Sequence, residues 1–392
     1  MTSVAAGKQW RAGHCVLAPD KFKGSLTAAR VAAHLAAGLR QLRPDVPVVI
    51  MPVADGGDGT VDAVVESGFA RLSTTVRGPG RARVVASFAI RDHTAVIELA
   101  QASGLHLNPG KPDATMAMTA SSIGTGELIK TAVERGARRV VLGLGGSACT
   151  DGGTGMLTAL GVRFLDEHGH QLPPGGGSLR KLARIDASAM IRVPVTVASD
   201  VDNPLLGVRG AANVYARQKG ARTADVDELE RGLAHFASIV RRDLHVDVVD
   251  RPGAGAAGGV GYAALAFLDA QVRPGIELVL EQLGFAEQVA GARLVITGEG
   301  CLDRQTLHGK APVGVARAAA AAGAAVVAVA GQCALSDQQL RRAHIEQAYA
   351  LTDIEPDPQI CMTEAGPLLE QVARDIAQSW LADKRHLVTD NR

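Results

Sequence analysis

The stretch VVLGLGGSACTDGGTG, residues 140–155, decides how the chain around it must fold. It opens with aliphatic and β-branched residues, which favour a buried strand, and the residues after Gly155 favour a helix. Six glycines between positions 143 and 155 let the backbone go where a side chain would block it. A strand, a glycine loop and a helix in this order aim backbone N–H groups at an anion. The stretch therefore predicts an anion-binding loop, with a tightly packed structural turn as the alternative.

Length and composition fit a folded protein of two domains. The chain has 392 residues, more than one compact core usually holds, and 47% of them are hydrophobic. Its 41 basic and 40 acidic residues leave a net charge of +1, which argues against a surface for polyanions. Five cysteines without a C-x-x-C pair indicate neither a zinc ribbon nor a disulfide framework. We expect a cytoplasmic protein without nucleic-acid or membrane partners, and the sequence is compatible with a homodimer.

Both ends of the chain share one pattern. Residues 14–67 alternate strand, loop and helix, and residues 294–381 do the same, which is typical of a parallel sheet. The fold class is therefore α/β, with one parallel-sheet domain built from both termini and a second, mixed α/β domain inserted between them. The expected boundaries are residues 1–65 and 290–392 for the first domain and residues 66–289 for the second.

The middle of the chain has a different pattern. Residues 71–77, 83–90 and 95–100 are predicted strands joined by short polar turns, which indicates an antiparallel meander. Residues 162–165 and 170–172, separated by a polar turn, predict a hairpin.

Polar loops follow several of the expected strands, where an open parallel sheet binds its ligands. Carboxylates in such loops can bind Mg²⁺ or deprotonate a hydroxyl, and lysines can hold phosphate or carboxylate. Glycine loops, a metal, cations and a base are together the parts of phosphoryl transfer. The carboxylates are Asp55, Asp58, Asp151, Asp200, Asp202, Glu299 and Asp303, and the lysines are Lys21, Lys23, Lys219 and Lys310.

The glycine loops leave other functions open. A dinucleotide-dependent oxidoreductase of a small hydroxy acid is the main alternative, because Gly143-x-Gly145-x-x-Ala148 follows a predicted strand. This fingerprint lacks an acidic residue at the end of a second strand about 20 residues further on. A non-catalytic regulator is the third interpretation. Acyl transfer is disfavoured, because no histidine accompanies a serine or cysteine elbow.

A series of motifs resembles the type I glycerate kinases in order and spacing, from about residue 14 to residue 332. The motifs are APDKFKGSL (18–26), PVADGGDGT (52–60), GTGELI (124–129), GLGGSA (143–148), DVDNPL (200–205), QKGA (218–221), VITGEG (295–300) and KAP (310–312). The resemblance implies a flavodoxin-like domain from both termini and a restriction-enzyme-like inserted domain. It also implies ATP-dependent phosphorylation of D-glycerate to 2-phosphoglycerate, with Mg²⁺.

The resemblance leads to an expected role for each candidate residue. Asp200 is the first candidate for the catalytic base and Asp55 the second, and Lys310 would neutralise the γ-phosphate. The predicted substrate-binding residues are Lys21, Lys23, Ser25 and Asp151, with a lysine on the glycerate carboxylate. The predicted phosphate-binding residues are Gly143, Gly145, Gly146, Ser147 and Gly298, and the predicted metal ligands are Glu299 and Asp202.

The chain departs from the family pattern at a few positions. Thr150 stands where the family usually has Asn, Arg217 where it has Pro, Cys301 where it has Arg, and Asp58 where it has Glu. Cys301 matters most, because a cation beside Glu299 could bind phosphate. We expect that duty to pass to Arg304 or Lys310.

Overall fold

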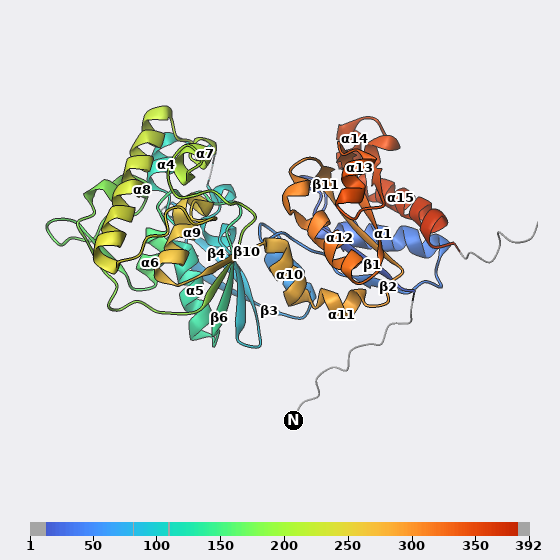
Figure 1. Ribbon diagram of the computed structural model, residues 1–392, viewed down its shortest axis with the longest axis horizontal. Coiled ribbons are helices and arrows are strands. Elements are labelled where there is room, and N and C mark those ends of the chain that lie inside the picture. Colours follow the sequence, from blue (N-terminus) through green and yellow to red (C-terminus); the bar gives the residue numbers. More distant parts are fainter. Residues whose placement is uncertain (1–12, 81, 109, 383–392) are drawn as a thin grey trace, which may run out of the picture. The chain divides into compact units, whose positions relative to one another are not determined.

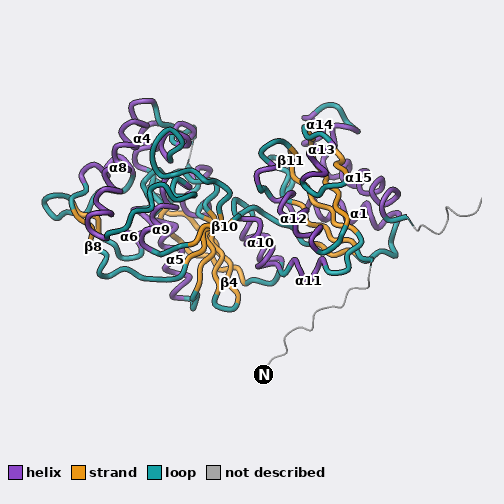
Figure 2. Tube along the Cα trace, in the orientation of Figure 1, coloured by secondary structure: helices purple, strands orange, loops and turns teal. Residues whose placement is uncertain are grey.

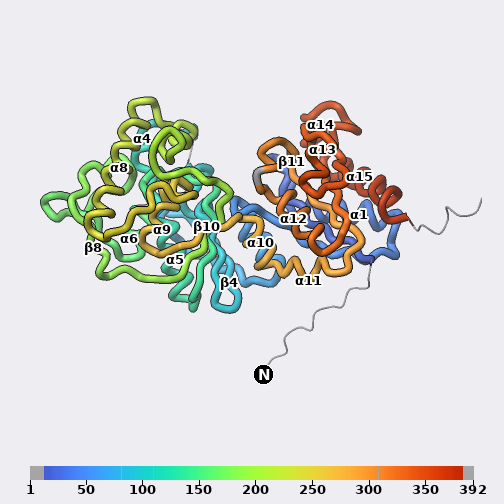
Figure 3. Tube along the Cα trace, in the orientation of Figure 1, coloured from blue at the N-terminus to red at the C-terminus, as the bar shows by residue number. Residues whose placement is uncertain are grey.

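The computed structural model describes residues 13–80, 82–108 and 110–382, which form two compact units (Figure 1). Unit 1 consists of the described residues up to Ala54 and from Val279 onward, and unit 2 is Asp55–Leu278. Figure 3 shows both the blue and the red end of the described chain in unit 1. Both borders fall earlier in the chain than the sequence predicts. The first does so because α2 (Thr60–Glu66) packs on strands of unit 2.

Unit 1 contains a five-stranded parallel sheet in the order β13-β12-β11-β1-β2. Numbered by their appearance in this unit, the strands lie in the order 2-1-3-4-5, which is that of flavodoxin-like sheets. The prediction of a flavodoxin-like fold from both ends of the chain is therefore confirmed. The strands are β1 (Cys15–Pro19), β2 (Val48–Ile50), β11 (Leu294–Leu302), β12 (Ala325–Cys333) and β13 (Gln347–Ala350).

Helices complete unit 1. The helices α1 (Ala28–Leu42) and α15 (Ala365–Trp380) lie side by side and share one core with alternate residues of β1, β11 and β12 (Figure 1). Thr27 caps α1 by accepting a hydrogen bond from the backbone N–H of Arg30. The crossover helix α12 (Ala311–Ala321) packs on β11 and β12. The shorter helices are α11 (Phe285–Val289), α13 (Asp337–Arg342) and α14 (Pro358–Thr363).

Unit 2 contains a six-stranded mixed sheet in the order β10-β9-β6-β5-β4-β3. The first three strands along the chain form the predicted antiparallel meander, and β5, β6, β9 and β10 run parallel to one another. The carboxyl ends of these four strands therefore share one edge of the sheet. The strands are β3 (Ala70–Arg77), β4 (Arg83–Arg91), β5 (Thr94–Glu98), β6 (Arg139–Gly143), β9 (Val195–Ala198) and β10 (Gln271–Arg273).

The helices of unit 2 border this sheet (Figure 2). Except for α2 and α10 (Gly275–Leu283), their apolar faces share one core with the sheet, in which the Phe164 and Phe236 rings meet edge to face at 5.8 Å. Besides α2, these helices are α3 (Ala100–Ser103), α4 (Ala114–Thr119), α5 (Ile123–Glu134), α6 (Thr154–Ala159), α7 (Ala211–Tyr215), α8 (Thr223–Leu244), α9 (Ala256–Phe267) and α10, which crosses the border to unit 1.

The hairpin predicted at residues 162–172 is present as a short antiparallel pair: the Asp166 N–H donates to the His170 carbonyl, and the Leu172 N–H donates to the Phe164 carbonyl. β7 (Arg163–Leu165) pairs with β8 (Arg184–Asp186), while Gln171 makes a single bridge to Leu165. β8 is the partner that the sequence did not indicate, and its Ile185 supplies an apolar side chain to the core. In the described part of the chain, no helix is both long and apolar enough to cross a membrane. All five cysteines lie in that part and carry free thiols.

Candidate active site

Glycines bring Asp55 to the carboxyl edge of the sheet in unit 2. A Cβ atom on Gly143 would lie 2.1 Å from the carbonyl oxygen of Gly56, and one on Gly145 would lie 2.8 Å from the Cα atom of Gly57. Any larger residue at these two positions would push the loop of residues 55–59 away. The loop therefore lies against the ends of β6 and β9, beside the glycine loop and Asp200.

Among the described carboxylates of this unit, Asp200 has the pKa that lies furthest from its ordinary value. It follows β9, and its Oδ1 atom accepts a hydrogen bond of 2.9 Å from the backbone N–H of Gly275. Loss of water around the carboxyl group, helped by the negative charges of Asp55 and Glu277, raises the pKa of Asp200 to about 7. The residue nevertheless keeps an exposed surface. An accessible carboxylate with this pKa suits a general base at neutral pH.

The glycine loop presents backbone donors beside Asp200. Among the described residues, nothing accepts a hydrogen bond from the N–H groups of Gly145, Gly146 and Ser147. Gly145 and Gly146 are exposed, and Gly146 has a φ of +72°, which favours glycine. Consecutive unpaired N–H groups form a concave site for an anion. Three of the four loop residues predicted to bind phosphate therefore carry such unpaired N–H groups, and their role stays a prediction.

Asp151 has a different environment from the one the sequence suggests. It is fully buried, and its carboxylate accepts hydrogen bonds from the backbone N–H groups of residues 122, 153 and 155 and from the hydroxyls of Ser121 and Ser122. These donors lie at the starts of α5 and α6, where a negative charge is favourable. The geometry makes Asp151 an internal anchor of the glycine loop, with no surface open to a substrate.

The candidate residues of unit 1 lie at the point where its strand order reverses, between β1 and β11. Lys21, Lys23 and Ser25 are in the loop after β1, and a Cβ atom on Gly300 would lie 3.3 Å from the Lys23 backbone nitrogen. Lys23 is exposed and Lys21 is half-buried. The Ser25 hydroxyl donates a hydrogen bond to the carbonyl of Met362 at the end of α14. Ligands of flavodoxin-like sheets bind at this switch point.

Glu299 and Lys310 meet at the same edge of unit 1. The Glu299 Oε2 atom is 3.5 Å from the Lys310 Nζ atom, and its Oε1 atom accepts a hydrogen bond from the Thr306 hydroxyl. Lys310 occupies the N-cap position of α12. The thiol of Cys301 is exposed, and burial together with Asp303 and Glu299 raises its pKa. Lys310 is therefore the cation that stands beside Glu299.

Two predicted site residues lie elsewhere in the units. Gly298 is buried inside β11, where a Cβ atom would lie 2.1 Å from the Val329 carbonyl oxygen, so it serves close strand packing. Asp202 forms an exposed ion pair of 2.8 Å with Arg209. No group of three or more His, Cys, Asp or Glu residues able to hold a metal occurs in the described ranges. Mg²⁺ is commonly held by one or two carboxylates plus phosphate oxygens, so the metal ligands stay a prediction.

Two buried charges support the loops in ways the sequence did not indicate. Glu98 ends β5 at 2% exposure, and its carboxylate accepts hydrogen bonds from the backbone N–H of Val61, at the start of α2, and from Gln101. Burial raises the pKa of Glu98. The sequence signal that could have identified Glu98 is its place as a carboxylate at the end of an aliphatic strand. Lys219, one of the loop lysines able to hold phosphate or carboxylate, is only 1% exposed and cannot contact either group directly.

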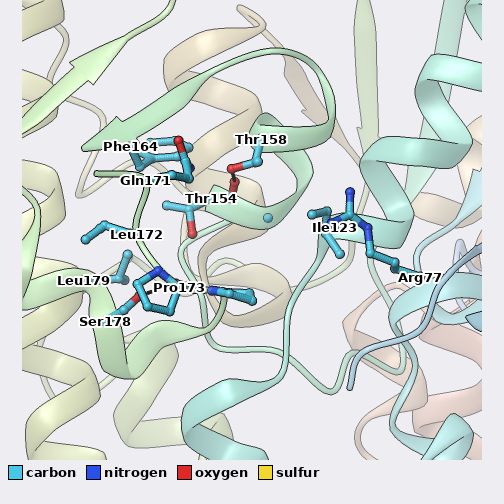
Figure 4. Close-up of a pocket in the computed structure, with 12 residues that line it drawn as sticks. Arg77, Ile123, Thr154, Thr158, Phe164, Gln171, Leu172, Pro173, Ser178 and Leu179 are labelled. Atoms are coloured by element: carbon cyan, nitrogen blue, oxygen red, sulfur yellow. Dashed lines mark hydrogen bonds between the residues drawn. The ribbon is translucent and has the colours of Figure 1, made fainter. Parts of the chain in front are cut away.

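Unit 2 also has a cavity of about 160 Å³ next to the Asp151 anchor (Figure 4). Arg77 and Ile123 lie on one side of it and Pro173, Ser178 and Leu179 on the other. Arg77 is its one charged lining residue, and Glu127 already binds its Nε atom at 2.8 Å. The cavity therefore lacks the carboxylates and cations that phosphoryl transfer needs, whereas the loops above have them.

The dinucleotide fingerprint does not have the required structural context. The helix after β6 begins at Thr154, well beyond Ala148, so the motif does not open a helix. The next strand, β7, lies outside the six-stranded sheet. The geometry therefore gives no support to a dinucleotide-dependent oxidoreductase.

Comparisons with known proteins agree with the motifs. Residues 15–381 match the family model of the glycerate kinase family. A glycerate kinase of Halalkalibacterium halodurans is 44% identical over 374 residues, covering 93% of this chain and 98% of that protein. The glycerate 2-kinase of Escherichia coli is 45% identical over 323 residues, covering 81% and 84% respectively. A crystal structure from Salmonella typhimurium LT2, 39% identical, matches with a TM-score of 0.81 over 94% of this chain and 98% of that one. The chain therefore belongs to the glycerate kinase family and is a kinase.

Proposed function

We propose that this kinase transfers the γ-phosphoryl group of ATP to the 2-hydroxyl of D-glycerate, with Mg²⁺, giving 2-phosphoglycerate, ADP and a proton. The identity of 45% with a relative named glycerate 2-kinase supports the choice of hydroxyl. The observation that carries the chemistry is Asp200, a carboxylate with a pKa of about 7 beside an exposed row of backbone N–H groups.

Unit 2 supplies the proton acceptor in this proposal. The glycerate hydroxyl has to lose its proton as its oxygen attacks phosphorus, and the ionised carboxylate of Asp200 takes that proton. Asp55 adds negative charge that favours proton uptake by Asp200. The N–H groups of Gly145, Gly146 and Ser147 hold phosphate oxygens. The oxygen–phosphorus bond to ADP then breaks as the new one forms.

Unit 1 supplies the cations. Lys310 offsets the negative charge of the phosphoryl group, and the exposed Lys23, with Lys21, binds the glycerate carboxylate. Glu299 would hold Mg²⁺, since carboxylate oxygens suit this ion, and Asp202 stays a separate predicted ligand in unit 2. When bound, Mg²⁺ supplies charge neutralisation and orientation of the ATP phosphates. Glu299 fits this role by its chemistry, because it is an oxygen donor beside Lys310.

The remaining expectations concern the cellular location and the oligomeric state of the enzyme. Five free thiols favour a reducing compartment, which supports a cytoplasmic location. The homodimer stays a prediction.

One assay tests the proposed function. Purified protein, ATP and D-glycerate are incubated with and without MgCl₂, and the products are identified by ³¹P NMR. We expect 2-phosphoglycerate and ADP with Mg²⁺, and neither product after chelation of the metal. L-glycerate is the control that shows which enantiomer the enzyme accepts. NADH is the control for the oxidoreductase alternative. The 3-phospho isomer, or no phosphoglycerate at all, would contradict the proposal.

A further inference from the structure

We propose that Lys219 is a positioning residue for phosphate binding: its buried ammonium holds the glycine loop from beneath and favours an ATP phosphate on the loop's exposed N–H groups. This inference rests on the proposed function and deepens it. Lys219 touches neither substrate, because it is 1% exposed, so it acts through Ser147 and Cys149.

A tight turn fixes the position of Lys219. It ends a short 3₁₀ turn, Arg217–Lys219, and is followed by Gly220 with a φ of +102°. A Cβ atom on Gly220 would lie 2.4 Å from the backbone nitrogen and oxygen of Asp113, so a larger residue would displace the turn. The backbone around Lys219 is therefore set by packing, independently of the loop that its side chain reaches.

The ammonium group joins two residues of the glycine loop, about seventy positions earlier in the chain. The Nζ atom donates hydrogen bonds of 2.9 Å to the Ser147 hydroxyl oxygen and 2.6 Å to the Cys149 carbonyl oxygen. Hydrogen bonds from a charged donor are among the stronger ones in proteins. They hold the chain on the carboxyl side of Gly145 and Gly146, where the unpaired N–H groups are.

The charge of Lys219 is not cancelled at short range. No carboxylate in the described residues lies within ion-pair distance of its Nζ atom. Burial lowers the pKa of Lys219, whereas Cys149 and Asp151 act in the opposite direction. A buried ammonium is costly, and it is retained here in contact with the same loop whose N–H dipoles also attract anions. The charge of Lys219 and the N–H dipoles therefore both attract a phosphate that binds to the loop.

Kinetics of charge-removing variants test the inference. Lys219→Met removes the charge and both hydrogen bonds, and Lys219→Gln removes the charge but keeps a donor. Lys130→Met removes an exposed lysine from α5 and is the matched control. We expect the KM for ATP to rise about 10- to 100-fold in both Lys219 variants, the range for a lost hydrogen bond to a charged group. The KM for glycerate should change less than about threefold, and Lys130→Met should match the wild type.

The outcomes separate this inference from the proposed function. If the wild type forms no phosphoglycerate, the proposed function fails first. If it does, an unchanged KM for ATP, or an equal rise in the KM for glycerate, overturns the role of Lys219. Hydrogen exchange on the wild type covers the case in which neither variant folds. ATP should then slow exchange at residues 145–147, and unaltered exchange there would refute the inference.

Discussion

Replacing Asp200 with asparagine should lower kcat by about 100- to 10,000-fold, the range that a general base contributes. Asparagine keeps an oxygen that can accept the hydrogen bond from the Gly275 N–H, so the loop should keep its shape. It cannot take up the proton of the attacking hydroxyl. Steady-state kinetics with ATP and D-glycerate measure the loss, and circular dichroism checks the fold.

The pH profile gives a second readout for Asp200. Because its pKa is about 7, the carboxyl group is ionised above that pH and protonated below it. Only the ionised form accepts a proton, so kcat/KM of the wild type, which reports groups of the free enzyme, should fall about tenfold per pH unit below pH 7. The residual activity of Asp200→Asn should lack this step. Asp227→Asn, on the exposed face of α8, is the control and should behave as the wild type. A kcat of Asp200→Asn within about threefold of the wild type would move the base assignment to Asp55.

Replacing Asp151 with asparagine should lower the free energy of unfolding by about 3 kcal/mol or more, as expected when a buried charge network loses one partner. The carboxylate accepts hydrogen bonds from five donors at full burial, and an amide would turn an NH₂ group toward some of them. Differential scanning calorimetry measures the change. We expect the transition that includes unit 2 to move to lower temperature.

A surface carboxylate with similar bonds is the matched control. Asp166 accepts hydrogen bonds from the backbone N–H groups of His168 and His170 in an exposed turn. Asp166→Asn should leave the thermal transition close to that of the wild type, since water replaces the lost interactions. If Asp151→Asn instead keeps wild-type stability and raises only the KM for glycerate, the sequence-based role in substrate binding is right and the anchor is wrong.

The arrangement of strands could be predicted because it follows from periodicity. Runs such as residues 15–18 and 294–297 are apolar, short and followed by polar loops, so a parallel sheet was the natural prediction. The pairing of β7 with β8 could not be predicted, because about twenty residues separate the two strands and no local pattern links them.

The roles of the charged loop residues were harder to predict. Asp151 and Asp200 look alike in the sequence, each following a strand in a polar loop. What separates them is burial and the number of donors around each carboxylate, which depend on helices remote in sequence. Lys219 is a similar case, because a lysine between polar and small residues ordinarily faces water. Long-range packing therefore decides which charges serve chemistry and which serve the scaffold.

The discontinuous composition of unit 1 has a consequence for how the protein is made. During translation, β1 and β2 leave the ribosome before all of unit 2, while β11, the neighbour of β1 in the sheet, follows it. Unit 2 is continuous and can fold as it emerges, whereas the first two strands keep one open edge until the last quarter of the chain appears. The nascent chain thus carries an unfinished sheet through most of its synthesis, and completion of unit 1 depends on release of the C-terminal segment.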